Sequence, residues 1–128
     1  MVYTVFMKTV LVVDDSRIMR SIVKSHFSEL RIPCDYLEAE DGEKALELLW
    51  KNPVDLILLD WNMPRLLGIE FLKKVRAMDI YKNLPIIMVT SEKARYNVIE
   101  ALKMGATDYI VKPINAKIFS DKISKIMR

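Results

Sequence analysis

Near its start the chain carries the stretch Thr9-Val10-Leu11-Val12-Val13-Asp14-Asp15-Ser16. Its first five residues are mostly β-branched or aliphatic, which is typical of a short strand covered on both faces. Ser16 is a favourable helix N-cap, and apolar residues follow it at every third or fourth position as far as Leu30. The stretch therefore predicts a buried strand that leads, through the carboxylates of Asp14 and Asp15, into an amphipathic helix.

The same alternation of a short apolar run and a longer helical segment continues along the chain. We expect further strands at residues 33–39, 56–59, 85–89 and 109–111, each followed by a helix. The run at 56–59 is the most apolar and predicts the central strand, whereas 33–39 is partly polar and suits a sheet edge. Units this short imply a parallel sheet with right-handed crossovers and helices on both faces. The fold class expected is α/β, doubly wound.

Length and composition restrict the class of protein further. A chain of 128 residues with 52% apolar and 29% charged residues forms one globular domain and is not intrinsically disordered. No apolar run approaches the roughly 20 residues of a membrane span, and the N-terminus lacks the basic segment of a signal peptide. The single cysteine, Cys34, excludes an internal disulfide and fits a cytoplasmic protein. A net charge of +3, with acids and bases interspersed, gives no indication of nucleic-acid binding.

Polar residues end four of the expected strands. The first strand is followed by Asp14 and Asp15, the third by Asp60, the fourth by Thr90 and the fifth by Lys112. In a doubly wound sheet the carboxyl ends of the strands border one crevice, so these side chains should converge there. Singly, the acids have ordinary explanations as helix caps or turn residues, and the lysine as a surface residue. Their coincidence at four strand ends favours a functional site.

The convergence of three carboxylates requires a compensating cation. Two like charges about 4 Å apart repel by roughly 4 kcal/mol at an effective dielectric constant of about 20. Lys112 supplies one positive charge, and oxygen-only ligands favour Mg²⁺ over metals that prefer imidazole. The lone histidine, His26, falls inside the first expected helix and is not available to the site. An aspartate beside Mg²⁺ suggests phosphoryl transfer, with Asp60 as nucleophile and with Thr90 and Lys112 binding phosphoryl oxygens.

Short motifs in this order and spacing resemble the receiver domains of two-component response regulators. The motifs are Leu11-Val12-Val13-Asp14-Asp15-Ser16, Asp60-Trp61-Asn62-Met63-Pro64 with Gly68, Val89-Thr90-Ser91, Gly105-Ala106 and Tyr109-Ile110-Val111-Lys112-Pro113. The resemblance covers residues 7–128, which are expected to form the receiver domain, and leaves residues 1–6 as an N-terminal extension. It implies a flavodoxin-like (βα)5 fold whose five-stranded parallel sheet has the order 2-1-3-4-5.

The resemblance also implies a role for each residue of the site. Asp60 would accept a phosphoryl group from a histidine kinase in a Mg²⁺-dependent reaction, and Thr90 and Lys112 would contact that group. Mg²⁺ would be held directly by Asp15, by Asp60 and by the backbone carbonyl of Asn62. Asp14 would act on the metal largely through water. The protein would catalyse only its own phosphorylation and dephosphorylation and would not be an enzyme acting on other substrates.

Phosphorylation would change the surface formed by the fourth helix, the fifth strand and the fifth helix. In the family, Thr90 moves toward the phosphoryl group, and the aromatic residue at the position of Tyr109 rotates into the vacated space. Asn62 and Glu92 occupy positions that set how quickly the acyl phosphate hydrolyses. Basic residues would suit this surface or its rim to acidic partner segments; they are Arg95, Lys103, Lys117, Lys122 and Lys125.

Within the family, residues 60–64 are similar to those of the single-domain chemotaxis regulators. That subgroup implies a cytoplasmic monomer phosphorylated by a histidine kinase, with a target such as a flagellar switch component and with a phosphatase, and no nucleic-acid or membrane contact. The family also implies a cis peptide bond between Lys112 and Pro113. One departure is Leu67, where an acidic residue commonly precedes the glycine, here Gly68. This departure concerns the start of the third helix and a partner contact rather than the phosphorylation site.

Alternatives remain inside and outside this family. A phosphorelay intermediate, or a receiver domain from a longer regulator, would share the same chemistry. A flavodoxin-like cofactor-binding module would share the architecture but needs a cradle rich in glycine and hydroxyl groups after the first strand, where this chain has two acids. A hydrolase that forms an aspartyl phosphate typically has a second aspartate two residues after the nucleophile, where this chain has Asn62. No recognition helix for nucleic acid is evident.

Overall fold

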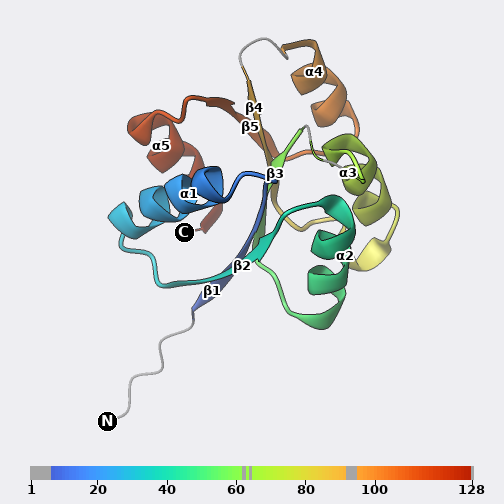
Figure 1. The fold of residues 1–128 in the computed structure, drawn as a ribbon, viewed down its shortest axis with the longest axis horizontal. Coiled ribbons are helices and arrows are strands. Elements are labelled where there is room, and N and C mark those ends of the chain that lie inside the picture. Colours follow the sequence, from blue (N-terminus) through green and yellow to red (C-terminus); the bar gives the residue numbers. More distant parts are fainter. Residues whose placement is uncertain (1–6, 62, 64, 92–94, 128) are drawn as a thin grey trace.

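The computed structural model of the protein describes residues 7–61, 63, 65–91 and 95–127. Strands and helices alternate along these residues, as the apolar pattern predicts (Figure 1). In chain order the elements are β1 (Lys8–Val13), α1 (Arg17–Glu29), β2 (Cys34–Ala39), α2 (Gly42–Lys51), β3 (Leu56–Asp60), α3 (Gly68–Arg76), the 3₁₀ helix η1 (Asp79–Tyr81), β4 (Ile86–Ser91), α4 (Arg95–Lys103), β5 (Asp108–Lys112) and α5 (Ala116–Met127).

The strands form one parallel sheet in the order β2-β1-β3-β4-β5, which confirms the expected fold class and strand order. Figure 1 shows α1 and α5 on one face of the sheet and α2, α3 and α4 on the other. The partly polar strand β2 lies at one edge, and the fully buried strand β3 lies at the centre. Among the described residues, no helix combines the length and apolarity needed to cross a membrane.

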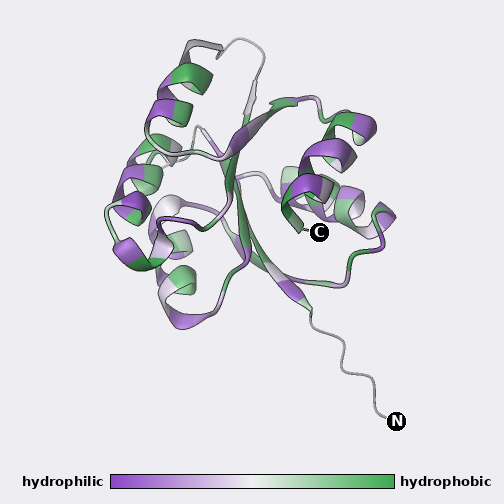
Figure 2. Ribbon diagram, turned by 180° about the vertical axis from the view of Figure 1, so that it is seen from behind, coloured by the Kyte–Doolittle hydropathy of each residue, from purple (hydrophilic) through white to green (hydrophobic). Residues whose placement is uncertain are grey.

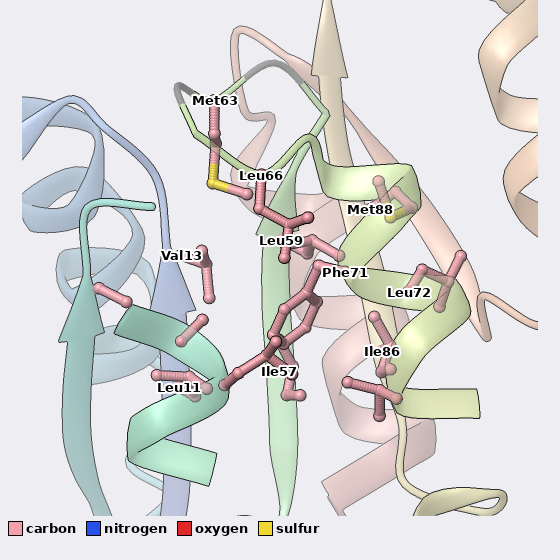
Figure 3. Packing of buried hydrophobic residues seen from close by; sticks show 14 of the residues in the cluster. Leu11, Val13, Ile57, Leu59, Met63, Leu66, Phe71, Leu72, Ile86 and Met88 are labelled. Atoms are coloured by element: carbon pink, nitrogen blue, oxygen red, sulfur yellow. The ribbon is translucent and has the colours of Figure 1, made fainter. Parts of the chain in front are cut away.

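Alternate residues of the central strands fill the two faces of the sheet because side chains of a strand point to opposite sides in turn. On one face, Leu11, Ile57 and Leu59 pack with Phe71 and Leu72 of α3 (Figure 3). The strands are coloured mainly as hydrophobic in Figure 2, whereas the helices show both hydrophobic and hydrophilic residues. The sheet therefore supplies the centre of the core, and each helix buries only one side.

On the other face, residues of β1 and β3 pack under α1 and α5. Val10, Val12 and Leu58 lie against this layer, where the rings of Phe27 and Phe119 meet edge to face with centroids 5.0 Å apart. Such a contact adds about 0.5–1.5 kcal/mol to the burial of the rings. The two packed layers hold the strands rigidly, so the residues at their carboxyl ends have defined positions.

The strands differ from the pattern-based boundaries by one or two residues at their ends; for example, β3 includes Asp60 and β5 spans Asp108–Lys112. The fourth strand, expected at 85–89, extends to Ser91, because residues 87–91 pair in register with residues 108–112 of β5. Thr90 is therefore a strand residue instead of the first residue after the strand. The helix η1 was not predicted, since three residues are too few to show a helical period.

Candidate functional site

The connection from β1 to α1 places the two consecutive aspartates differently. Asp14 is buried, and its Oδ1 accepts a hydrogen bond of 2.8 Å from the amide of Ser16. Its own amide donates to the carbonyl oxygen of Ala39 in β2 at 3.0 Å. Asp15 is exposed, and the Ser16 hydroxyl caps α1 by accepting from the amide of Met19 at 3.2 Å. The carboxylate of Asp14 is thus buried, whereas that of Asp15 borders solvent.

Asp60 ends the central strand and lies beside Lys112 of β5. The Lys112 Nζ is 3.2 Å from Oδ1 of Asp60 and 3.2 Å from Oδ2 of Asp14. Asp60 is only 8% exposed and Asp14 only 4%, so water screens this cluster weakly. The structure therefore brings together the residues predicted to end the first, third and fifth strands.

Burial, followed by the neighbouring charge of Asp14, raises the pKa of Asp60 to about 6, although Lys112 acts in the opposite direction. Burial alone would lower the pKa of Lys112, but the charges of Asp60 and Asp14 outweigh it and raise that pKa above its ordinary value. The lysine is therefore firmly protonated, and Asp60 is a carboxylate at neutral pH that holds protons more readily than an ordinary aspartate.

The acidic residues fit a hard divalent cation. Ligand oxygens of Asp14, Asp15 and Asp60 all lie within 4.8 Å of one another. This donor set contains oxygen alone, which suits Mg²⁺, and the exposed Asp15 leaves room for the several waters that Mg²⁺ retains. One positive charge, on Lys112, contacts two of these acids, so a divalent cation would complete the charge balance.

Thr90 lies on the neighbouring strand β4 and is 2% exposed. Its hydroxyl makes one long contact, of 3.5 Å, to the carbonyl oxygen of Ser91. Beyond it, a groove of about 360 Å³ is lined by Thr90, Val98 of α4 and the half-buried Tyr109 of β5, among others. The two residues expected to form the switch therefore border the same groove.

Lys122 of α5 also contacts Tyr109, and the sequence did not indicate this contact. Its Nζ lies 4.0 Å from the centre of the Tyr109 ring and donates hydrogen bonds to the carbonyl oxygen of Tyr109 and, at 3.0 Å, to Asp108. Lys122 is thus an internal partner of β5 instead of a free basic residue of the surface. Lys103, Lys117 and Lys125 are exposed, as expected.

The remaining predictions from the sequence concern the cis peptide bond, the residues that tune hydrolysis and the start of α3. The peptide bond between Lys112 and Pro113 is cis, as the resemblance implies. Asn62, expected to supply a backbone ligand and to tune hydrolysis, lies outside the described residues, as does Glu92. The side chain of Arg95 is likewise outside the described part. At the departure noted in the sequence, Leu67 stands at the N-cap of α3 and makes no side-chain capping bond.

Sequence reasoning missed Arg20. This residue of α1 donates a hydrogen bond of 2.7 Å from Nη1 to the backbone carbonyl of Asp14. Arg20 comes five positions after Asp15, and nothing in the local sequence indicates such a contact. Only the packing of α1 against the sheet reveals it.

The family comparison agrees with this architecture. The model of the response regulator receiver domain matches residues 10–124. The chain therefore belongs to the response regulator receiver domain family, signalling proteins of two-component systems. This membership removes the flavodoxin-like cofactor module from consideration.

Among its relatives, the chain is similar to chemotaxis proteins. It is 47% identical over 118 residues to the chemotaxis protein CheY homolog of Campylobacter jejuni, covering 91% of this chain and 90% of the relative. It is 42% identical over 117 residues to the chemotaxis protein CheY of Pseudomonas aeruginosa, covering 91% and 94%. The solved structure of Vibrio cholerae chemotaxis protein CheY4 is similar with a TM-score of 0.82 and 35% identity, over 94% of this chain and 99% of that one.

Proposed function

We propose that this protein is a phosphorylation-dependent signalling switch in which Asp60 accepts a phosphoryl group from the phosphohistidine of a histidine kinase. In this step the bond between phosphorus and the imidazole nitrogen breaks, and a bond forms between phosphorus and a carboxylate oxygen of Asp60. The released imidazole takes up a proton. The observation that carries the proposal is the ammonium of Lys112, which contacts both Asp60 and Asp14 in a buried crevice at 3.2 Å.

Each residue of the crevice has a distinct part in this proposal. Asp14, Asp15, Asp60 and the backbone carbonyl of Asn62 would hold Mg²⁺, which neutralises negative charge on the phosphoryl group when bound. Lys112 keeps a second positive charge beside the same group. The buried hydroxyl of Thr90 donates to a phosphoryl oxygen after a short inward movement.

The pKa of Asp60 supports its assignment as the nucleophile. A value of about 6 leaves the carboxylate ionised at neutral pH, while its basicity exceeds that of an ordinary aspartate. Nucleophiles of higher basicity attack more readily as long as they remain deprotonated. Burial and the charge of Asp14 therefore leave Asp60 ionised, and able to attack, at neutral pH.

The output of the switch is assigned to the surface of α4, β5 and α5. Thr90 and Tyr109 border one groove, so a movement of the hydroxyl toward the phosphoryl group changes the space available to the ring. The exposed cations Lys103, Lys117 and Lys125 suit an acidic segment of a protein target. Similarity to chemotaxis proteins supports a target such as a flagellar switch component.

The proposal also covers how the phosphoryl group is removed, which residues form the domain and where the protein acts. The protein catalyses only its own phosphorylation and dephosphorylation, with Asn62 and Glu92 tuning hydrolysis and a phosphatase accelerating it. Residues 7–128 form the receiver domain, residues 1–6 are an N-terminal extension, and the protein is a cytoplasmic monomer. A phosphorelay intermediate would use the same site but would pass the phosphoryl group on to another histidine.

The test uses Trp61, which follows Asp60 directly and is partly buried. Tryptophan fluorescence is followed while Mg²⁺ and then acetyl phosphate are added to the wild type and to Asp60→Asn. We expect a saturable change that needs both additions, and intact mass should show one phosphoryl group on the wild type alone. Phosphorylation of Asp60→Asn, or none of the wild type, would overturn the proposal.

A further inference from the structure

Arg20 connects the first turn of α1 to the acidic crevice. Its Nη1 donates to the backbone carbonyl of Asp14 at 2.7 Å, and its Nε donates to Oε1 of Glu38 at 3.0 Å. The side chain is only 14% exposed, so both hydrogen bonds are largely shielded from water. The fork of the guanidinium thus joins the end of β1 to the end of β2.

The position of this cation is unusual on electrostatic grounds. The N-terminal turn of a helix carries a partial positive charge and favours acidic residues, yet the first turn of α1 contains none. Glu38 compensates this charge, since its Oε1 accepts from Arg20 at 3.0 Å; its other oxygen accepts from Lys24 at 3.0 Å. The carboxylate therefore orients the Nε side of Arg20, while the carbonyl of Asp14 accepts from its Nη1.

The carbonyl in question belongs to the peptide unit that joins Asp14 to Asp15. That unit is planar, so holding its oxygen fixes the plane from which the Asp15 side chain departs. The preceding amide is held by Ala39 at 3.0 Å, and the carboxylate of Asp14 by Ser16 at 2.8 Å. Arg20 thus restrains the one segment that carries both acids.

We infer that Arg20, oriented by Glu38, is a positioning residue that holds the Asp14–Asp15 peptide so that both carboxylates can bind a divalent cation. The inference rests on the proposed function, because it concerns the same metal site. Outer partners of metal ligands commonly change metal affinity by about 10–100-fold when they are removed.

A purely electrostatic role and a positioning role of Arg20 predict opposite changes in Mg²⁺ affinity when its side chain is removed. The removal of a positive charge near the crevice should strengthen Mg²⁺ binding if electrostatics alone matter. The loss of the bond to the Asp14 carbonyl should weaken it. Lys24 is a matched control, because it carries the same charge and binds the same carboxylate, while its hydrogen bond goes to Glu38.

The experiment measures Mg²⁺ affinity from Trp61 fluorescence and from calorimetry, without any phosphodonor. We expect Arg20→Met to bind Mg²⁺ about tenfold more weakly than the wild type. Lys24→Met should bind as tightly as the wild type or slightly more tightly. Thermal unfolding in EDTA checks that each variant is folded.

Arg20→Lys extends the test to a variant of unchanged charge. A lysine cannot hold the carbonyl and Glu38 in one planar fork, so about threefold weaker binding is expected. This variant decides the question if Arg20→Met fails to fold. Wild-type affinity in Arg20→Lys, or wild-type or tighter binding in a folded Arg20→Met, would overturn the inference while leaving the proposed function intact. A wild type that binds no Mg²⁺ would instead overturn the proposed function.

Discussion

Lys112 and Asp14 form an ion pair at 3.2 Å although 98 positions separate them in the chain. Their strands are not neighbours, since β3 and β4 lie between β1 and β5 in the sheet. The long side chain of Lys112 spans this gap across the carboxyl ends of the strands and meets Asp60 on the way. A single cation therefore compensates acids from two different strands.

Lys112→Met should destabilise the protein in the absence of metal. The change leaves Asp14 and Asp60 buried without their cation, so the free energy of unfolding should fall by about 1–3 kcal/mol. Urea denaturation in EDTA measures this loss, and added Mg²⁺ should restore more stability to the variant than to the wild type. Lys117→Met, which removes an exposed lysine of α5, should change stability by less than about 0.5 kcal/mol. An unchanged stability of Lys112→Met in EDTA would contradict the structural role of the pair.

Asp60→Asn should stabilise the metal-free protein at alkaline pH. The pKa of Asp60 is about 6 in the folded protein and near 3.8 in the unfolded chain, so the folded state binds more protons between these values. The free energy of unfolding of the wild type therefore decreases as the pH rises through this window. At pH values above about 6 the variant should exceed the wild type by up to roughly 3 kcal/mol, and below about 4 the difference should become small.

Urea denaturation of both proteins in EDTA, at the two ends of this pH range, gives the comparison. Asp79→Asn, which removes an exposed carboxylate of η1, controls for the change in net charge. The same difference between Asp60→Asn and wild type at both pH values would show that Asp60 is not a destabilised carboxylate.

Leu67→Asp should stabilise α3. Leu67 occupies the N-cap with an extended backbone but offers no acceptor to the first amides of the helix, and its side chain is 43% exposed. An aspartate would accept a backbone hydrogen bond and place a negative charge at the positive end of the helix, a gain of about 1 kcal/mol. Leu67→Ala removes the same apolar side chain without adding an acceptor, so it should not gain this stability. Equal midpoints of the two variants in chemical denaturation would argue against a missing cap.

Gly68→Ala should destabilise the protein even though alanine favours helices. A methyl group at Gly68 would lie 2.3 Å from the carbonyl oxygen of Asp60 and 3.0 Å from that of Trp61. These atoms belong to the backbone at the end of β3 and just after it, so α3 must shift, at a cost of roughly 2–3 kcal/mol. The gain from helix propensity is only about 1 kcal/mol. Glu70→Ala, in the same helix and exposed, is the control, and a stabilised Gly68→Ala would contradict the close approach.

Much of this protein follows from local patterns in the chain. The alternation of apolar runs and helical periods predicts a doubly wound parallel sheet, because each element must bury one side or both. Acids and a lysine at the strand ends predict a shared crevice, since the carboxyl ends of parallel strands lie at one edge. Element boundaries were less certain: β4 runs to Ser91 because pairing with β5 continues beyond the apolar residues.

Tertiary structure alone decided how the individual side chains share that crevice. Asp14 is buried and Asp15 exposed, although they are consecutive and chemically identical. Arg20 reaches the backbone carbonyl of Asp14 after β1, and Lys122 covers the ring of Tyr109, through contacts that depend on how α1 and α5 pack on the sheet. Local periodicity determines which elements form, because it reflects burial along one segment. Contacts between segments depend on strand register and helix orientation, which the whole core sets together.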